Sequence, residues 1–280
     1  MAVQISNAFV TLFDSEVKQA YQGQRLLAGV ARERSGIEGS TVKFPKIGKG
    51  SATIRVPQTD VTPLNVSYSQ VTATMEDYIA AEYSDIFNQQ KVNFDERQEL
   101  VQVVSGAIAR RMDQVVLDAL NAASSPSTVA NSVGGANTDL NIEKLRATKK
   151  ALDAKNVPAD GRCFLMHANS LSALLADTEV TSSDFASVKA LVTGEIGTYM
   201  GFKFITFGDR DEGGLAIDGS ADRTLFAFHR DALGLGIGMN QNSRVDYIAE
   251  KTSFLVASMF SAGAVAIDDE GIVKITCRES

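Results

Sequence analysis

The sequence predicts an α+β protein, with helices and strands grouped in separate stretches of the chain. Three observations carry this prediction: a strand-like region at 41–84, a long stretch of helical periodicity at 93–122, and a mixture of short helices and strands after residue 140. The 280 residues are enough to bury a sizeable core. The formal net charge of -7 argues against sustained binding to phosphate backbones or anionic membranes.

The composition also excludes several classes of protein. Cys163 and Cys277 are the only cysteines, and they are far apart, so a disulfide framework and a cysteine-based zinc site are not expected. The first residues lack the cationic region of a secretory signal. The longest near-apolar stretch, 254–267, is shorter than the roughly 20 residues that a bilayer span requires, so no membrane role is expected.

The N-terminal region predicts an amphipathic helix over residues 6–22. Phe9 and Phe13 lie on its apolar face, with no obvious core partner nearby in the sequence. The following RERSGIEGS, which is polar and contains glycine, reads as a linker. Phe9 and Phe13 are therefore candidates for contacts with another subunit.

Residues 41–84 predict a long, irregular two-stranded ribbon. The stretch is rich in Val, Thr, Ile and Tyr, and Pro45, Pro57 and Pro63 keep it out of an interior sheet. An isolated two-stranded ribbon is marginally stable in water. Either the ribbon folds onto its own domain, or a neighbouring copy of the chain covers it.

The same ribbon carries a basic stripe in an otherwise acidic chain, made of Lys43, Lys46, Lys49 and Arg55. Two interpretations remain equal. The stripe is a solvated edge that lysines protect from aggregation, or it is half of a charge contact with an acidic surface on a neighbouring subunit.

A long helix is predicted from Asn93, as N-cap, to about residue 122. Glu96 lies three residues after Asn93, as in a capping box, and about 30 residues at 1.5 Å each would form a rod of about 45 Å. Such a rod suggests a mechanical spine. Its predicted core face consists of Leu100, Val104, Ile108, Met112 and Val115.

The rest of the chain predicts a smaller α+β region after a low-complexity boundary loop at 124–140. A helix is expected at 141–154, a strand at 162–167 and a short helix after it, and further strands up to 272–277.

No stretch matches a catalytic, cofactor or metal motif. The glycines of GEIGTYMG (194–201) precede a strand instead of opening a helix, and LGLGIG (233–238) is followed by no capped helix, so both predict turns or close packing. Cys163 and His167 would lie about 13 Å apart on one strand. DRDEGG (209–214) starts like a calcium loop but has Ser220 where a bidentate Glu is needed.

The order of these parts resembles the major capsid proteins of tailed bacteriophages, with the Hong Kong 97-like fold. The resemblance covers nearly the whole chain and rests on several segments in family order. These are GSTVKFPKIGKGSATI, the stretch from MEDYIAAEYSDIF through the long helix, KALDAKNVPADGRCFLMHANSLSALL, GEIGTYMGFKFI and LFAFHRDALGLGIG.

The resemblance implies an N-terminal arm (1–38), an extended loop (39–85), a peripheral domain with the spine helix (86–155), an axial domain (156–238), and C-terminal strands (239–280) that return to the peripheral domain. It implies pentamers and hexamers that close an icosahedral shell around double-stranded DNA in the virion, assembled in the host bacterial cytoplasm. The implied partners are further copies of the chain, a separate scaffolding protein, a portal protein and a decoration protein. Two alternatives stay open: an encapsulin-type compartment shell, and a cytosolic α+β enzyme that uses Cys163 or His229.

Overall fold

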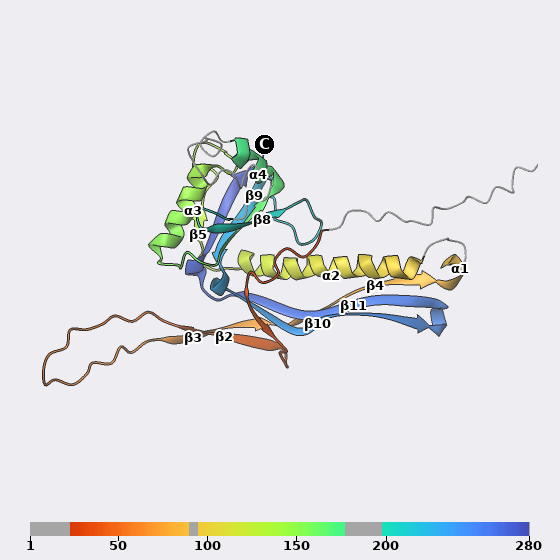
Figure 1. The fold of residues 1–280 in the computed structure, drawn as a ribbon, viewed down its shortest axis with the longest axis horizontal. Helices are drawn as coiled ribbons and strands as arrows, with labels where there is room; N and C mark the ends of the chain where they lie inside the picture. The colour runs from red at the N-terminus through yellow and green to blue at the C-terminus, as the bar shows by residue number, and fades with distance from the viewer. Residues whose placement is uncertain (1–22, 90–94, 177–197, 280) are drawn as a thin grey trace, which may run out of the picture.

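The structure is a computed structural model that describes residues 23–89, 95–176 and 198–279. Figure 1 shows a compact part that contains α3 (Ile142–Ala154) and α4 (Ala168–Ala176), and an elongated part along α2 (Glu96–Asn121). A narrow ribbon projects from the elongated part. The predicted α+β fold is confirmed.

A six-stranded sheet forms the centre of the compact part. Its strand order is β5 (Ser127–Val129), β12 (Ile272–Arg278), β9 (Asp222–His229), β6 (Arg162–His167), β8 (Phe202–Phe207) and β7 (Thr198–Tyr199). Every residue of β6 is buried, because the strand lies inside the sheet and both its faces are covered. The β7–β8 turn has positive φ at Met200 and Gly201, as a tight hairpin requires.

A four-stranded sheet forms the elongated part. Its order is β1 (Arg32–Ser35), β10 (Leu233–Ile248), β11 (Ser253–Ala266) and β4 (Glu76–Asp85), and α1 (Ile86–Gln89) follows β4. Helix α2 packs along this sheet, and Ile108 and Met112 join Phe260 and Ala262 in one buried cluster. Short 3-10 helices at Arg230–Ala232, Ala249–Lys251 and Asp269–Gly271 connect the later strands.

The spine helix α2 begins at Glu96, with Asp95 as its N-cap. The Asp95 side chain accepts a hydrogen bond from the Arg97 backbone N–H at 3.2 Å, and Asn93, the predicted cap, lies outside the described residues. The 26 helical residues span about 39 Å. On the predicted core face Val104, Ile108, Met112 and Val115 are buried, while Leu100 near the helix start is half-buried. No described helix is long and apolar enough to cross a membrane.

The segment before the ribbon is part of the folded body. Leu27, Val30 and Ala31 are buried in the main core. The RERS that reads as a linker forms β1 and pairs in parallel with β10, from Arg32 opposite Gly234 to Ser35 opposite Ile237. The predicted helix at 6–22, with Phe9 and Phe13, lies outside the described residues.

The sheets group the chain differently from the division that the resemblance implies. Helix α3 and strand β12, expected with the spine helix, belong to the six-stranded sheet, where β12 lies between β5 and β9. The predicted boundary loop at 124–140 contains β5 of the same sheet. Strand β4, expected in the extended loop, instead pairs with β11 beside the spine helix. These pairings join residues more than 100 positions apart, which local patterns do not encode.

Candidate assembly surfaces and the joint between the sheets

The ribbon consists of two antiparallel strands, β2 (Thr41–Ile47) and β3 (Tyr68–Thr74). Its base is covered by the chain's own four-stranded sheet. Val42, Phe44 and Ala73 point into a buried cluster with Ile267, and the Phe44 ring is fully buried. The first of the two predicted alternatives therefore describes the base of the ribbon.

Glycines in β10 and β11 make this close contact geometrically feasible. A Cβ atom at Gly234 would lie 2.8 Å from the Phe44 ring, and one at Gly236 would lie 2.7 Å from the Val42 side chain. A Cβ atom at Gly263 would lie only 2.1 Å from the backbone oxygen of Thr74. The glycines of LGLGIG thus open a long strand and leave space for the ribbon, in place of forming a phosphate-binding loop.

The outer part of the ribbon, residues 49–65, is exposed at every position. Figure 1 shows it extending well beyond the rest of the molecule. It carries several apolar side chains, and Ile54 and Val61 are 95% and 91% exposed. We call residues 49–65 the ribbon tip. An exposed apolar segment on an otherwise polar surface is typical of a contact with another protein.

The basic stripe finds acidic partners within its own chain at two of its four positions. The Lys46 Nζ lies 2.8 Å from Asp268 Oδ1, and the Lys49 Nζ lies 2.6 Å from Glu270 Oε2. The hydrogen bond with Glu270 raises the pKa of Lys49. Both acids belong to the turn between β11 and β12, so these ion pairs join the ribbon to the body. Lys43 on β2 and Arg55 in the ribbon tip are exposed.

A second feature is the joint where the spine helix meets the loop between β8 and β9. Asp113, on α2, is completely buried. Its carboxylate accepts hydrogen bonds from the backbone N–H groups of Leu26 (2.9 Å) and Leu27 (3.0 Å), and its Oδ2 lies 3.3 Å from Arg210. One carboxylate therefore connects the N-terminal segment, the spine helix and the β8–β9 loop.

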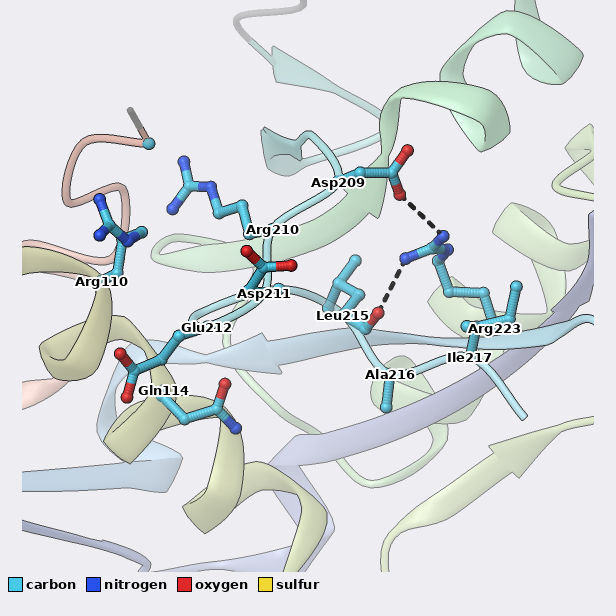
Figure 2. Close-up of a pocket in the computed structure, with 12 residues that line it drawn as sticks. Arg110, Gln114, Asp209, Arg210, Asp211, Glu212, Leu215, Ala216, Ile217 and Arg223 are labelled. Atoms are coloured by element: carbon cyan, nitrogen blue, oxygen red, sulfur yellow. Dashed lines mark hydrogen bonds and ion pairs between the residues drawn. The ribbon is translucent and has the colours of Figure 1, made fainter. Parts of the chain in front are cut away.

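Two further contacts tie the β8–β9 loop to α2. Arg111 forms an ion pair with Glu212 at 3.1 Å, and the Gly213 N–H donates to Gln114 Oε1 at 2.9 Å. These groups border an open hollow of about 800 Å³, and Figure 2 shows Arg110 and Gln114 from the helix facing Arg210 and Glu212 from the loop. The hollow is lined by charges of both signs. DRDEGG therefore forms the wall of a joint, and the predicted solvated turn accounts for only part of its role.

The candidate nucleophile and bases are not assembled into a catalytic group. Burial raises the pKa of the Cys163 thiol, which opposes thiolate formation. His167, at the other end of β6, contacts Asp209 and Glu279, and His229 bonds through its Nε2 to the backbone oxygen of Asp160 at 2.7 Å. Within residues 23–89, 95–176 and 198–279, no three His, Cys, Asp or Glu side chains are grouped as metal ligands.

Sequence reasoning did not identify Asp113, Arg223 and Glu279, the polar residues that make the most long-range contacts. Asp113 was assigned away from the core face of the spine helix. Its only local signal is a charged residue directly after Met112, between the apolar positions of the helix. Arg223 and Glu279 carry no local signal at all, because their partners lie 56 positions apart.

Comparison with known proteins agrees with this geometry. The family model described as phage capsid protein matches residues 5–279. No match was found among curated proteins. The fold is similar to the capsid of the cyanophage P-SCSP1u, with a TM-score of 0.76, 14% sequence identity, and coverage of 100% of this chain and 96% of that one.

Two other capsid structures are similar over nearly their whole length. The head of the Helicobacter pylori bacteriophage KHP40 gives a TM-score of 0.77 at 12% identity, covering 96% of this chain and 95% of that chain. Mycobacterium phage Che8 gives 0.72 at 16% identity, covering 96% and 97%. The resemblance to bacteriophage capsid proteins is confirmed, and the Hong Kong 97-like fold is consistent with these neighbours. The chain belongs to the phage capsid protein family.

Proposed function

We propose that this capsid protein assembles through its ribbon into pentamers and hexamers, which close an icosahedral shell around double-stranded DNA. The observation that carries the proposal is the contrast along the ribbon. Its base is locked onto its own sheet by Phe44, while its tip exposes Ile54 and Val61. A ribbon held rigidly at one end and apolar at the other is suited to lie on a neighbouring copy.

The two sheets supply the domains of such a subunit. We assign the four-stranded sheet with α2 to the peripheral domain, and the six-stranded sheet with α3 and α4 to the axial domain around the five- and six-fold axes. The loop between β8 and β9 then connects the two domains beside the spine helix. Each domain has its own buried cluster against which neighbouring copies would add contacts.

The charge and the likely partners follow from enclosure of DNA. A net charge of -7 gives the shell little general attraction for nucleic acid, so DNA would be contained without being bound. Assembly in the host bacterial cytoplasm, with a scaffolding protein, a portal protein and a decoration protein, completes the proposal. The role is structural and not enzymatic, and the match to the phage capsid family favours a virion over an encapsulin compartment.

The proposal is tested by placing charges on the ribbon tip. The double variant Ile54→Asp/Val61→Asp changes two highly exposed side chains, so the subunit should keep its fold. It should fail to assemble when co-expressed with the cognate scaffolding protein, because burial of unpaired carboxylates at a contact is unfavourable. Closed shells are counted by negative-stain electron microscopy, and the fold is checked by circular dichroism.

The matched control is Thr53→Asp/Thr62→Asp, which adds the same charges at the adjacent exposed polar positions. It should assemble more completely than the apolar-site variant. Normal shells from Ile54→Asp/Val61→Asp would show that the ribbon tip is not an assembly contact.

A further inference from the structure

His167 lies at the end of β6, where three separate parts of the chain meet. Its ring is almost fully buried. Its Nδ1 lies 3.2 Å from Glu279 Oε1, directly after β12, and its Nε2 lies 3.1 Å from Asp209 Oδ1, in the β8–β9 loop. The two carboxylates thus face the two opposite nitrogens of one imidazole.

A neutral imidazole cannot satisfy this arrangement. It carries one N–H, so it can donate to only one of the two carboxylates. The Asn169 backbone N–H also approaches Nδ1 at 3.3 Å, a contact that uses Nδ1 as an acceptor and leaves its lone pair facing Glu279. The buried Nε2 makes no well-directed hydrogen bond, although Asp209 is within reach. An imidazolium, with two N–H groups, would donate to both carboxylates.

The surrounding charges favour the same state. Among the described residues, the charged groups at His167 are Asp209 from the β8–β9 loop, Glu279 after β12, and Arg223 from β9. Arg223 contacts both acids, through its Nη2 to Asp209 at 3.3 Å and to Glu279 at 3.1 Å. Two carboxylates and one guanidinium sum to one negative charge, which a protonated His167 neutralises.

We propose that His167 is a proton-operated clasp that, when protonated, fastens the β8–β9 loop to the end of β12. Histidine is the side chain whose charge ordinarily changes between about pH 5 and pH 8. On protonation, Nδ1 changes from an acceptor for Asn169 to a donor for Glu279, and Nε2 donates to Asp209. On deprotonation, one carboxylate loses its donor and the loop is held by Arg223 alone.

The clasp acts on the joint between the two sheets, since the loop that carries Asp209 also carries Arg210, Glu212 and Gly213. These residues contact Asp113, Arg111 and Gln114 of the spine helix. Figure 2 shows Asp209 and Arg223 joined on the side of the loop opposite Arg110. Acidification therefore tightens the connection between the six-stranded sheet and the spine helix. This regulation goes beyond the structural role and does not depend on which assembly the chain forms.

The first test is direct. The chain has only two histidines, His167 and His229, so the imidazole Cε1–Hε1 signals of the purified full-length chain can be assigned with the single variant His229→Gln. His167 should take up a proton as the pH falls from 8 to 5, together with a shift of its Nδ1 resonance to that of an N–H nitrogen. An imidazole that stays neutral throughout, or stays charged throughout, would overturn the proposal.

The second test measures the loop. Amide hydrogen exchange of residues 208–217, corrected for the intrinsic pH dependence, should be about threefold slower at pH 5.5 than at pH 8, the effect of a partly exposed ion pair. The control His229→Gln should behave like the original chain. His167→Gln, which cannot change its charge, should lose the dependence on pH.

Asp209→Asn covers the case in which His167→Gln does not fold. The Asp209 side chain is 83% exposed, so this variant should keep the fold. It should reduce the pH effect on the loop while leaving proton uptake by His167 visible. An undiminished pH effect in Asp209→Asn, or in a folded His167→Gln, would show that the clasp does not exist.

Discussion

Replacement of Asp113 tests how the N-terminal segment is held to the spine helix. In Asp113→Ala, the backbone N–H groups of Leu26 and Leu27 lose their acceptor and Arg210 loses its buried partner. A buried donor without a partner costs about 1–3 kcal/mol, so we expect the free energy of unfolding to fall by about 3 kcal/mol. Asp113→Asn keeps one acceptor oxygen and removes a buried charge, and should lose about 1–2 kcal/mol.

The same residue predicts a dependence on pH. Burial raises the pKa of the Asp113 carboxyl above its model value of 3.8, although the backbone donors of Leu26 and Leu27 and the charge of Arg210 act in the opposite direction. The folded state therefore binds the proton more tightly than the unfolded state. As the pH falls from above the raised pKa toward 3.8, the original chain should gain stability relative to Asp113→Asn. At higher pH this contribution is lost.

Urea unfolding followed by circular dichroism measures both effects across the pH range. Asp118→Asn is the matched control, because Asp118 lies on the same helix and is exposed. It should change the free energy of unfolding by less than about 0.5 kcal/mol. A loss below about 1 kcal/mol in Asp113→Ala would refute the argument, since it would mean that the two N–H groups find water or other acceptors at no cost.

Three further variants test the packing. Ile108→Asp places an unpaired charge in the buried cluster beneath the spine helix and should abolish folding, as seen by circular dichroism, whereas Val103→Asp at a 38% exposed position should not; a folded Ile108→Asp would contradict the core face described above. Gly263→Ala should cost about 1–3 kcal/mol because its Cβ would meet the Thr74 backbone, while Gly219→Ala, with open space around it, should be nearly neutral in the same urea titration; equal effects would contradict the close ribbon contact. Burial raises the pKa of Cys277 from 9.0 to about 12, so as the pH rises from about 9 the unfolded state releases a proton that the folded state keeps, and the stability advantage over Cys277→Ala should shrink; a constant difference up to pH 11 would refute this placement of the thiol.

Much of the fold was predictable because its signals are local. The spine helix follows from apolar residues at spacings of three and four, and its buried positions Val104, Ile108 and Met112 follow from the same spacing. Strand β6 was predicted with the bounds that the structure shows, because a short apolar run between a turn and a capped segment is read from adjacent residues.

The candidate surfaces were only partly predictable. The sequence suggested that a ribbon needs a cover, but its lysines do not reveal that Lys46 and Lys49 meet Asp268 and Glu270, more than 200 positions later. The glycines of LGLGIG indicated close packing. Their partner, Phe44, could not be named, because it comes from a strand 190 positions earlier.

By itself, the sequence determined the elements: the helical spine, the strand-rich ribbon, and the order of parts that is typical of the phage capsid family. Only the tertiary structure decided which elements share a sheet, why Asp113 is buried on a helix, and how His167 comes to lie between Asp209 and Glu279. The physical reason is the range of the interactions. Backbone periodicity is set by neighbours within a few residues, whereas burial and charge pairing depend on groups that only the folded chain brings together.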